Sequence, residues 1–381
     1  MRCGICSHPL SIGLSLDNMP SAAQSFCEKV EASKRKSDTM KVAMCGGCGT
    51  VQYLGPTVPY YKNTIRSSKL SEEFVEFRQK QFNSFINALQ KGPCSVFELG
   101  AGEGEHLDIF KELGCKTAGI ENSSELVSIA RQKGHDVSRG FLDGNNNFPN
   151  LNKNKFDCVV SFNFIEHLPS PRGSLLQLAS LLVEDGCGLF EVPNYDMIDE
   201  FKLFNEFIPD HRFYFKKDTF RTLLSLSGFE VQSMDTIWHD YIISACVKKR
   251  RGGRWQEYHE ERNNLKVQLE LFLESTNPEQ NAVWGAGHQS LATISNLGLE
   301  RYLSCVIDSS PKKQNTFCPA SALPVCSPDV LRTGQIKKIL LIAAGYNDEI
   351  LSIIRTNFFG DFVVAIVRYG RVEYAKDNRT G

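Results

Sequence analysis

The sequence predicts an α/β protein with a doubly wound parallel sheet, preceded by a small cysteine-rich module. Three observations lead to this prediction. Short apolar runs alternate with amphipathic helical patterns over roughly residues 70–230. A glycine-rich turn follows the first of these runs at residues 100–104, and a second glycine turn at residues 285–287 opens another alternating segment. Two Cys-x-x-Cys pairs precede both segments.

Length and composition narrow the class of protein. At 381 residues the chain is too long for one core, and its 41% hydrophobic and 23% charged residues are typical of a globular protein. The net charge of −1 argues against nucleic acid or an anionic membrane as the main partner, since both select a basic excess. The apolar runs are too short to span a membrane and no signal peptide follows Met1, so a cytoplasmic location and reduced cysteines are expected.

The first element is the cysteine-rich module, whose pairs are Cys3 with Cys6 and Cys45 with Cys48. Both pairs have the spacing of a zinc knuckle, and four thiolates form a closed tetrahedral site. The sequence therefore predicts structural zinc, with redox-active or unpaired thiols as the alternative. A module of this size buries little apolar surface, so the metal would contribute to folding and not to catalysis.

The middle of the chain predicts alternating strands and helices. A helical pattern from about residue 68 precedes a strand at 95–99, the glycine turn and a helix that ends near 113. A second strand at 116–120 ends in Glu121, and further strands are expected at 157–161 and 188–192. In such a sheet the ligand lies beyond the carboxyl ends of the strands.

The glycine turn predicts a nucleotide-type cofactor. Gly100, Gly102 and Gly104 allow close approach of the backbone, and Glu121 is placed to accept the ribose hydroxyls. These features fit dinucleotides and S-adenosylmethionine alike. The Gly-x-Gly-x-Gly spacing differs from the Gly-x-Gly-x-x-Gly that packs a helix against pyrophosphate. Glu98 would repel a diphosphate but suits a cofactor with an amino group and a sulfonium.

Residues 97–104 resemble motif I of class I S-adenosylmethionine-dependent methyltransferases. Residues 119–123 are similar to the second-strand signature of that class, and residues 161–168 resemble the segment after its fourth strand. The resemblance implies that S-adenosylmethionine is bound by one set of residues: Glu98, Gly100, Ala101, Gly102, Gly104, Glu121, Asn122 and Asn163. For Glu166 and His167, a role in orienting the loop and a role in catalysis both remain open.

The whole chain resembles three-domain sugar C-methyltransferases that act on nucleotide-linked deoxysugars. Residues 45–52 are close to the second zinc knuckle of that family, and residues 283–288 and 306–314 match its C-terminal segments. The resemblance implies three domains. They are a zinc-binding module at 1–66, a class I methyltransferase domain at 67–250 that binds S-adenosylmethionine, and a C-terminal Rossmann-like substrate domain at 251–381.

The family carries its active-site base in a Tyr-x-Glu-His segment, which corresponds here to Ile208, Asp210 and His211. The resemblance implies that His211 removes a proton beside a ketone, giving an enolate that attacks the methyl group, and that Asp210 orients the imidazole. Because the tyrosine and the glutamate are replaced, methylation of a hydroxyl group stays open. A loop histidine without a catalytic role is the alternative for His211.

The last part of the chain predicts a second α/β segment. A basic, glycine-broken run at 248–254 is the expected linker, and an amphipathic helix follows it. A strand at 282–284, the glycine turn and a strand ending in Asp308 form another βαβ pattern. By the resemblance this domain closes over the nucleotide-linked substrate, with His288 and Lys313 at its phosphates.

The expected function is therefore C-methylation of a nucleotide-linked deoxy or keto sugar by S-adenosylmethionine. The alternatives are methylation of oxygen or carbon in another small molecule, a dinucleotide-dependent dehydrogenase, and a zinc-ribbon module that binds nucleic acid. The expected partner is a small molecule, with neither nucleic acid nor a membrane, and the sequence leaves the oligomeric state open.

Overall fold

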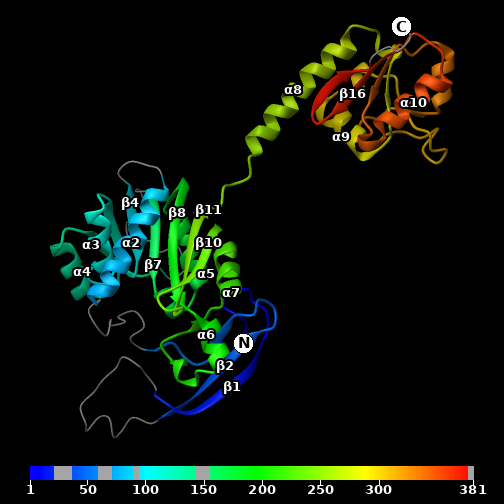
Figure 1. Cartoon of the computed structure of the whole chain (residues 1–381). Coiled ribbons are helices and arrows are strands. Elements are labelled where there is room, and N and C mark those ends of the chain that lie inside the picture. The colour runs from blue at the N-terminus through cyan, green and yellow to red at the C-terminus, as the bar shows by residue number, and fades with distance from the viewer. Residues whose placement is uncertain (21–36, 59–70, 90–93, 143, 145–154, 376–381) are drawn as a thin grey trace, which may run out of the picture. The chain divides into compact units, whose positions relative to one another are not determined.

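The computed structural model describes residues 1–20, 37–58, 71–89, 94–142, 144 and 155–375. The chain forms two compact units, Met1–Arg251 and Gly252–Gly381, and each is described by itself (Figure 1). The boundary expected between residues 66 and 67, and Cys27 between the two cysteine pairs, lie outside the described residues.

The larger sheet of the first unit has seven strands in the order β10-β11-β8-β7-β4-β5-β6. Their bounds are β4 Ser95–Leu99, β5 Lys116–Glu121, β6 Asp136–Arg139, β7 Phe156–Phe162, β8 Leu182–Pro193, β10 Phe229–Ile237 and β11 Ile242–Lys249. The strands from β6 to β8 are parallel, whereas β11 runs antiparallel to β8 and to β10. The sheet is therefore mixed and not wholly parallel, because a short hairpin turn joins β10 to β11.

Helices cover both faces of this sheet, which confirms the predicted α/β class. They are α2 Glu72–Ala88, α3 Glu105–Glu112, α4 Ser124–Gln132, α5 Pro171–Ser180 and α7 Lys217–Leu226. Helices α2, α3 and α4 lie on one face, and α5 and α7 on the other (Figure 1). Phe82 of α2 stacks on Phe110 of α3 at 4.3 Å between ring centroids, while Leu175 and Leu223 belong to the core of the opposite face.

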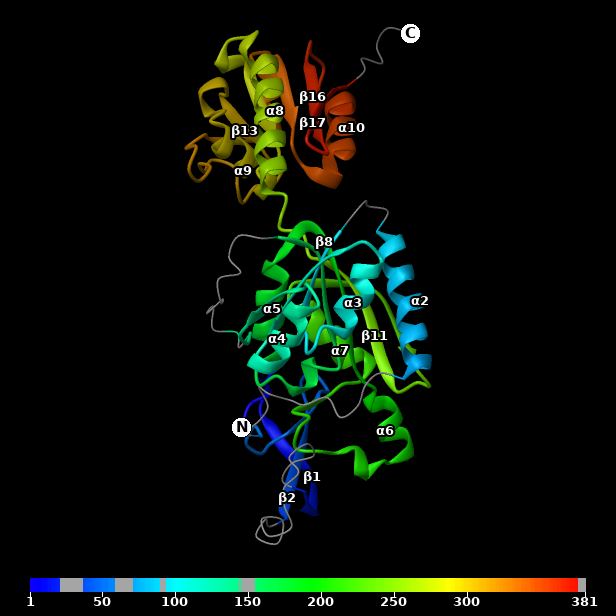
Figure 2. The same ribbon diagram turned by 90° about the vertical axis from the view of Figure 1, so that its left-hand side faces the viewer.

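A smaller antiparallel sheet has the order β1-β2-β3-β9, with bounds β1 Leu10–Met19, β2 Asp38–Cys45, β3 Val51–Tyr53 and β9 Phe213–Tyr214. The cysteine-rich module supplies three of these strands, and the chain between β8 and α7 supplies the fourth. Helix α6, Tyr195–Phe201, lies near this sheet (Figure 2). The module therefore shares a sheet and a compact unit with the segment that contains His211.

The second unit is built on a six-stranded sheet in the order β14-β13-β12-β15-β16-β17. Its strands are β12 Asn281–Trp284, β13 Cys305–Ile307, β14 Val325–Cys326, β15 Lys338–Leu341, β16 Val363–Arg368 and β17 Arg371–Tyr374, and only β17 pairs antiparallel. Helices α8, Trp255–Glu274, and α9, His288–Leu297, pack in one core cluster, and α10, Asn347–Asn357, packs in the other. Among the described residues, no helix combines the length and the hydropathy that a membrane crossing requires.

Candidate active site

The turn between β4 and α3 is shaped by three glycines in the left-handed region, with φ of 78° at Gly100, 53° at Gly102 and 80° at Gly104. A Cβ atom at Gly100 would lie 2.7 Å from the Phe164 ring, and one at Gly104 would lie 2.7 Å from His135. A Cβ atom at Gly102 would meet nothing within 4 Å. The turn therefore combines a tightly held backbone with open space over its middle, which fits close approach of a cofactor.

Glu121 lies at the carboxyl end of β5, beside this turn. Its Oε2 accepts a hydrogen bond from the Gly102 N–H at 3.2 Å, and its Oε1 accepts one from the Ser123 N–H at 2.8 Å. These bonds fix the carboxylate at the glycine turn, where ribose hydroxyls could bind it. Asn122 is the next residue, and its carbonyl accepts a hydrogen bond from Arg139.

The other predicted cofactor residues divide between the surface and the interior. Asn163 is exposed at the end of β7, with φ of 46°, and its N–H donates to the Glu191 carbonyl. Glu98 is only 1% exposed, and its Oε1 lies 2.9 Å from Nδ1 of His106. Ala101 is buried in the core. The structure thus bonds Glu121 to the glycine turn and places Glu98 and Ala101 in the interior, while Asn163 follows β7, the strand next to β4.

The segment that carries His211 is fastened at several backbone positions. The Tyr214 hydroxyl accepts a hydrogen bond from the Ile208 N–H and donates one to the Ile208 carbonyl, each at 2.9 Å. The Arg212 N–H donates to the Glu166 carbonyl at 2.8 Å, and the Arg212 carbonyl accepts from the Tyr53 N–H at 3.0 Å. His211 is therefore held between the carboxyl end of β7 and strand β3 of the small sheet.

His211 meets the short 3-10 helix η2, Ile165–His167, which follows β7. The ring centroids of His211 and His167 are 4.8 Å apart. Side-chain nitrogen and oxygen atoms of Glu166, His167 and His211 all lie within 4.8 Å of one another. Nδ1 of His167 lies 2.8 Å from the Asp210 carbonyl, which can only accept, so Nδ1 carries the proton and Nε2 the lone pair. These residues form one cluster, called here the acceptor cluster: Glu166, His167, Asp210 and His211.

Burial controls the charge of this cluster. It lowers the pKa of His211 well below 6.5, and the neighbouring His167 lowers that pKa further. Burial also lowers the pKa of His167 and raises the pKa of Glu166 to about 8. Near neutral pH both imidazoles are therefore uncharged, and His211 can accept a proton. The Asp210 backbone carbonyl accepts from Nδ1 of His167, and an orienting role of its carboxylate toward His211 stays a prediction.

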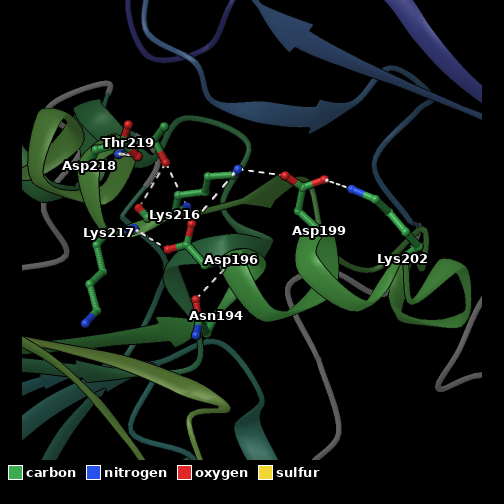
Figure 3. A network of polar contacts seen from close by, with 8 residues as sticks. All are labelled: Asn194, Asp196, Asp199, Lys202, Lys216, Lys217, Asp218 and Thr219. Carbon is green, nitrogen blue, oxygen red and sulfur yellow. Dashed lines mark hydrogen bonds and ion pairs between the residues drawn. The ribbon is translucent and has the colours of Figure 1, made fainter.

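A polar network holds helix α6 against the start of α7 (Figure 3). Lys216 Nζ lies 2.8 Å from Asp199 Oδ2, and the Lys217 N–H donates to Asp196 Oδ2 at 3.2 Å. Asn194 caps α6 by accepting from the Asp196 N–H at 3.0 Å. The network therefore joins the residues before the His211 segment, in α6, to the residues after it, at the start of α7.

The four cysteines of the front module converge. The Sγ atoms of Cys3 and Cys48 are 3.6 Å apart, those of Cys6 and Cys45 are 3.5 Å apart, and all four lie within 4.8 Å of one another. Burial by itself would raise the pKa of the Cys45 thiol, but the N–H groups of Cys48 and Gly47, together with the thiols of Cys6 and Cys48, lower the pKa to about 7. The arrangement matches the closed donor set that tetrahedral zinc requires.

The second unit contains a cavity of about 390 Å³ at the carboxyl ends of β12, β13 and β15. The predicted His288 and Lys313 both line it, together with Asp308 and Tyr346, which the sequence reading did not propose as site residues. Asp308 accepts hydrogen bonds from the N–H groups of Ala286 and Ser310, each at 2.9 Å, and pairs with Lys313 at 3.0 Å. Asp308 lies at the end of the second strand of its βαβ unit, as Glu121 does in the first unit, and this position was the sequence signal that could have identified it.

Comparison with known proteins agrees with this geometry. The family described as a methyltransferase domain matches residues 74–234, and the family described as a C-methyltransferase C-terminal domain matches residues 247–366. The chain is also similar to the C-methyltransferase NovU of Streptomyces niveus, with 21% identity over 285 residues that cover 67% of this chain and 68% of NovU.

Solved structures show a weaker likeness. The PH0226 protein of Pyrococcus horikoshii has a TM-score of 0.40 and 15% identity, over 50% of this chain and 98% of its own. Magnesium protoporphyrin IX methyltransferase from Synechocystis has a TM-score of 0.38 and 16% identity, over 48% of this chain and 90% of its own. Scores this low carry no argument, so the identification rests on the two family matches and the curated relative. The chain is an S-adenosylmethionine-dependent methyltransferase, and its residues 247–366 match the family described as a C-methyltransferase C-terminal domain.

Proposed function

We propose that the protein transfers a methyl group from S-adenosylmethionine to a carbon atom beside the ketone of a nucleotide-linked sugar. The observation that carries the proposal is the half-buried, uncharged His211, which packs against the residues that follow β7. Strand β7 pairs directly with β4, so the acceptor cluster and the glycine turn follow neighbouring parallel strands. A base beside the cofactor turn suits removal of a proton from carbon.

In this proposal one set of residues binds the cofactor and another acts on the acceptor. Glu121 and the glycine turn bind and orient S-adenosylmethionine, which supplies an electrophilic methyl group and leaves as S-adenosylhomocysteine. His211 accepts the proton from the carbon beside the ketone, since burial keeps its imidazole neutral. The His167 ring packs beside His211 and is itself fixed by its hydrogen bond to the Asp210 carbonyl. The Tyr214 hydroxyl fixes the loop before His211 by bonding to the N–H and the carbonyl of Ile208.

The cavity of the second unit supports a nucleotide-linked acceptor. In this proposal His288 and the first turn of α9 bind phosphate, because the N-terminus of a helix attracts anions. Lys313 neutralises Asp308, which would otherwise repel a phosphate at the glycine turn. The exposed ring of Tyr346 at the same cavity offers a surface on which a base could stack.

In the same proposal Cys3, Cys6, Cys45 and Cys48 hold a structural zinc ion that stabilises the small sheet. Cys45 ends β2, and β3 pairs with β9 two residues after His211, so the metal would also support the base. We expect Cys45→Ser to lose zinc and folded protein together, as measured by elemental analysis and circular dichroism. A variant that stays folded and active without metal would exclude a structural zinc site.

The test is methyl transfer from labelled S-adenosylmethionine to a panel of nucleotide-linked keto sugars, with NMR of the product to locate the new methyl group. A C-methyl product is expected, and His211→Ala should lower turnover by about 100-fold or more while the affinity for S-adenosylhomocysteine stays unchanged. Wild-type turnover in His211→Ala would remove this residue from the mechanism. Failure of every nucleotide-linked sugar, with the cofactor bound, would exclude the proposed acceptor.

Methylation of a hydroxyl group is the second candidate, and Ile208 is the observation that favours it. The resembling family has a tyrosine at this position, and a hydroxyl acceptor requires a base but no group that stabilises an enolate. The same NMR measurement separates the two candidates, since an O-methyl and a C-methyl group have different chemical shifts.

A further inference from the structure

Glu166 is a buried carboxyl group that the mechanism above does not use. Its side chain is 2% exposed, and within the described part of the chain its Oε2 has no hydrogen-bond partner. Its Oε1 lies 3.7 Å from Nε2 of His167, the nitrogen that carries the lone pair. A buried polar atom without a partner is costly in a folded protein, so its retention beside the proposed base calls for a functional reason.

Within the part of the chain that the structure describes, no cation pairs with this carboxyl group. Among the described residues, His167 is its one ion-pair contact within 4.0 Å, and burial keeps that imidazole uncharged. The guanidinium of Arg212 donates instead to the Gly55 carbonyl of the front module. Strands β8 and β9 pack against η2. The titratable groups on η2 and on or beside these strands, apart from Arg212, are His167 itself, Asp210, His211 and Tyr214 around β9, and Glu184, Asp185, Cys187 and Glu191 of β8, of which Glu191 pairs with Arg78. None of these supplies a positive charge to Glu166, so the neutral acid is its stable form near pH 7.

We infer that Glu166 is a catalytic acid that donates its O–H to the carbonyl oxygen of the acceptor while His211 removes the proton from the neighbouring carbon. This inference rests on the proposed C-methylation and specifies how the enolate is stabilised. It also accounts for Ile208, which offers no hydroxyl group where the resembling family has a tyrosine. A donor placed where negative charge develops is among the strongest catalytic devices.

The step balances in atoms and charge. His211 takes the proton of the carbon beside the ketone, and the electron pair of that C–H bond forms a C=C bond. The carbonyl π electrons move to oxygen, which is held by the hydrogen bond from Glu166. When the carbon bonds to the incoming methyl group, the carbonyl is restored, the S–CH3 electron pair stays on sulfur, and His211 releases its proton to solvent.

The first experiment measures enolisation without methyl transfer. With S-adenosylhomocysteine bound, exchange of the proton beside the acceptor ketone is followed by NMR in D2O for three variants. Glu166→Ala should slow exchange by about 100-fold, whereas Glu166→Gln, whose amide still donates, should stay within about tenfold of wild type. The exposed Glu230→Gln is the matched control and should change nothing. Equal losses in Glu166→Gln and Glu166→Ala would overturn the inference.

The pH profile is the second readout. Because the wild-type acid ionises near pH 8, turnover should fall above that pH, and the fall should disappear in Glu166→Gln. An alkaline limb that persists unchanged in Glu166→Gln would overturn the inference. If Glu166 served as a base, Glu166→Gln would instead be the inactive variant, which also contradicts the assignment.

A third measurement needs no acceptor. An acid whose pKa is raised on folding stabilises the fold below its unfolded pKa of about 4.5, and this is lost as the pH rises through about 8. The melting temperature of wild type should therefore drop between pH 5 and pH 9 more than that of Glu166→Gln. Parallel curves would show that Glu166 is not a neutral acid. An O-methyl product would instead refute both proposals, while a C-methyl product with Glu166→Gln as slow as Glu166→Ala would refute only this one.

Discussion

The two units each contain a glycine turn that is bonded to an acidic residue at the end of the next strand. In the first unit Glu121 accepts from the N–H groups of Gly102 and Ser123, at 3.2 and 2.8 Å. In the second unit Asp308 accepts from the N–H groups of Ala286 and Ser310, at 2.9 Å each. In each pair the second donor is two residues after the acid. The same local device is therefore used twice in the chain.

The two turns differ in backbone and charge. The first has three glycines in the left-handed region and, among the residues that the structure describes, no ion pair on Glu121. The second has one such glycine, Gly285, and pairs Asp308 with Lys313. In the proposed function, the carboxylate without a lysine accepts the ribose hydroxyls of the cofactor, while the one paired with lysine tolerates a phosphate nearby. The comparison teaches that two turns with the same hydrogen bonds differ in the charge next to the acid, and this difference is what the proposal assigns to cofactor and acceptor.

The largest expected effect is on the affinity for S-adenosylmethionine, which should depend on Glu121 and not on Asp308. Glu121→Ala should weaken S-adenosylmethionine binding by about 100-fold, because hydrogen bonds to a charged group contribute about 1.5–3 kcal/mol each. Asp308→Ala should leave that affinity within about twofold. Isothermal titration calorimetry of both variants measures the difference, and equal losses would mean that the second turn also binds the cofactor.

The next effect concerns the backbone of the turns. Gly104→Ala should destabilise the protein by about 1–3 kcal/mol, because φ is 80° and the new Cβ would lie 2.7 Å from His135. Gly287→Ala should change stability by less than about 0.5 kcal/mol, since φ is −101° and nothing lies within 4 Å. Urea unfolding compares them, and similar losses would remove the distinction between the turns.

Asp308→Asn should raise KM for a nucleotide-linked acceptor by about tenfold, a loss of about 1.4 kcal/mol. Burial alone would raise the pKa of Asp308, but the Ser310 N–H, Lys313 and the Ala286 N–H lower it, so the residue is a carboxylate at neutral pH. The asparagine amide would turn an NH2 group toward one of the donors that Asp308 now accepts from, so that donor would lose its acceptor. Asp329→Asn, on an exposed side chain of the same unit, is the control; an unchanged KM in Asp308→Asn would exclude this acid from the acceptor site.

The smallest effect belongs to Lys313→Gln, whose ion pair with Asp308 is half exposed and worth at most about 1 kcal/mol. We expect KM for the acceptor to rise by less than about fivefold, and more at low salt than at high salt because screening weakens the lysine in wild type. The neighbouring exposed Lys312→Gln is the control. A loss of 100-fold would show that Lys313 binds the substrate directly.

Local patterns predicted much of the fold. The strands expected at 95–99, 116–120, 157–161 and 188–192 fall within β4, β5, β7 and β8. Apolar periodicity and glycine position act over a few residues, so they can be read along the chain. The antiparallel β10–β11 pair was not predicted, because pairing direction depends on how the chain returns to the sheet.

The sequence by itself determined the cofactor chemistry. The glycine turn, Glu121 and the four cysteines are defined by spacing, and the structure gathers each group as the spacing indicates. It also singled out His211 as a candidate base. These features are local because backbone conformation constrains residues that are close in sequence, and because the cysteines come from a repeated Cys-x-x-Cys motif.

Only the tertiary structure decided what surrounds that base. Glu166 and His167 are more than forty residues from His211 in the sequence, and they meet because β9 pairs with β3 while Arg212 bonds to the end of η2. Their charges depend on burial, which raises the pKa of the carboxyl and lowers those of the imidazoles. Desolvation is a property of the packed interior, so no spacing in the sequence could have predicted how burial shifts the pKa of Glu166 and those of the two imidazoles.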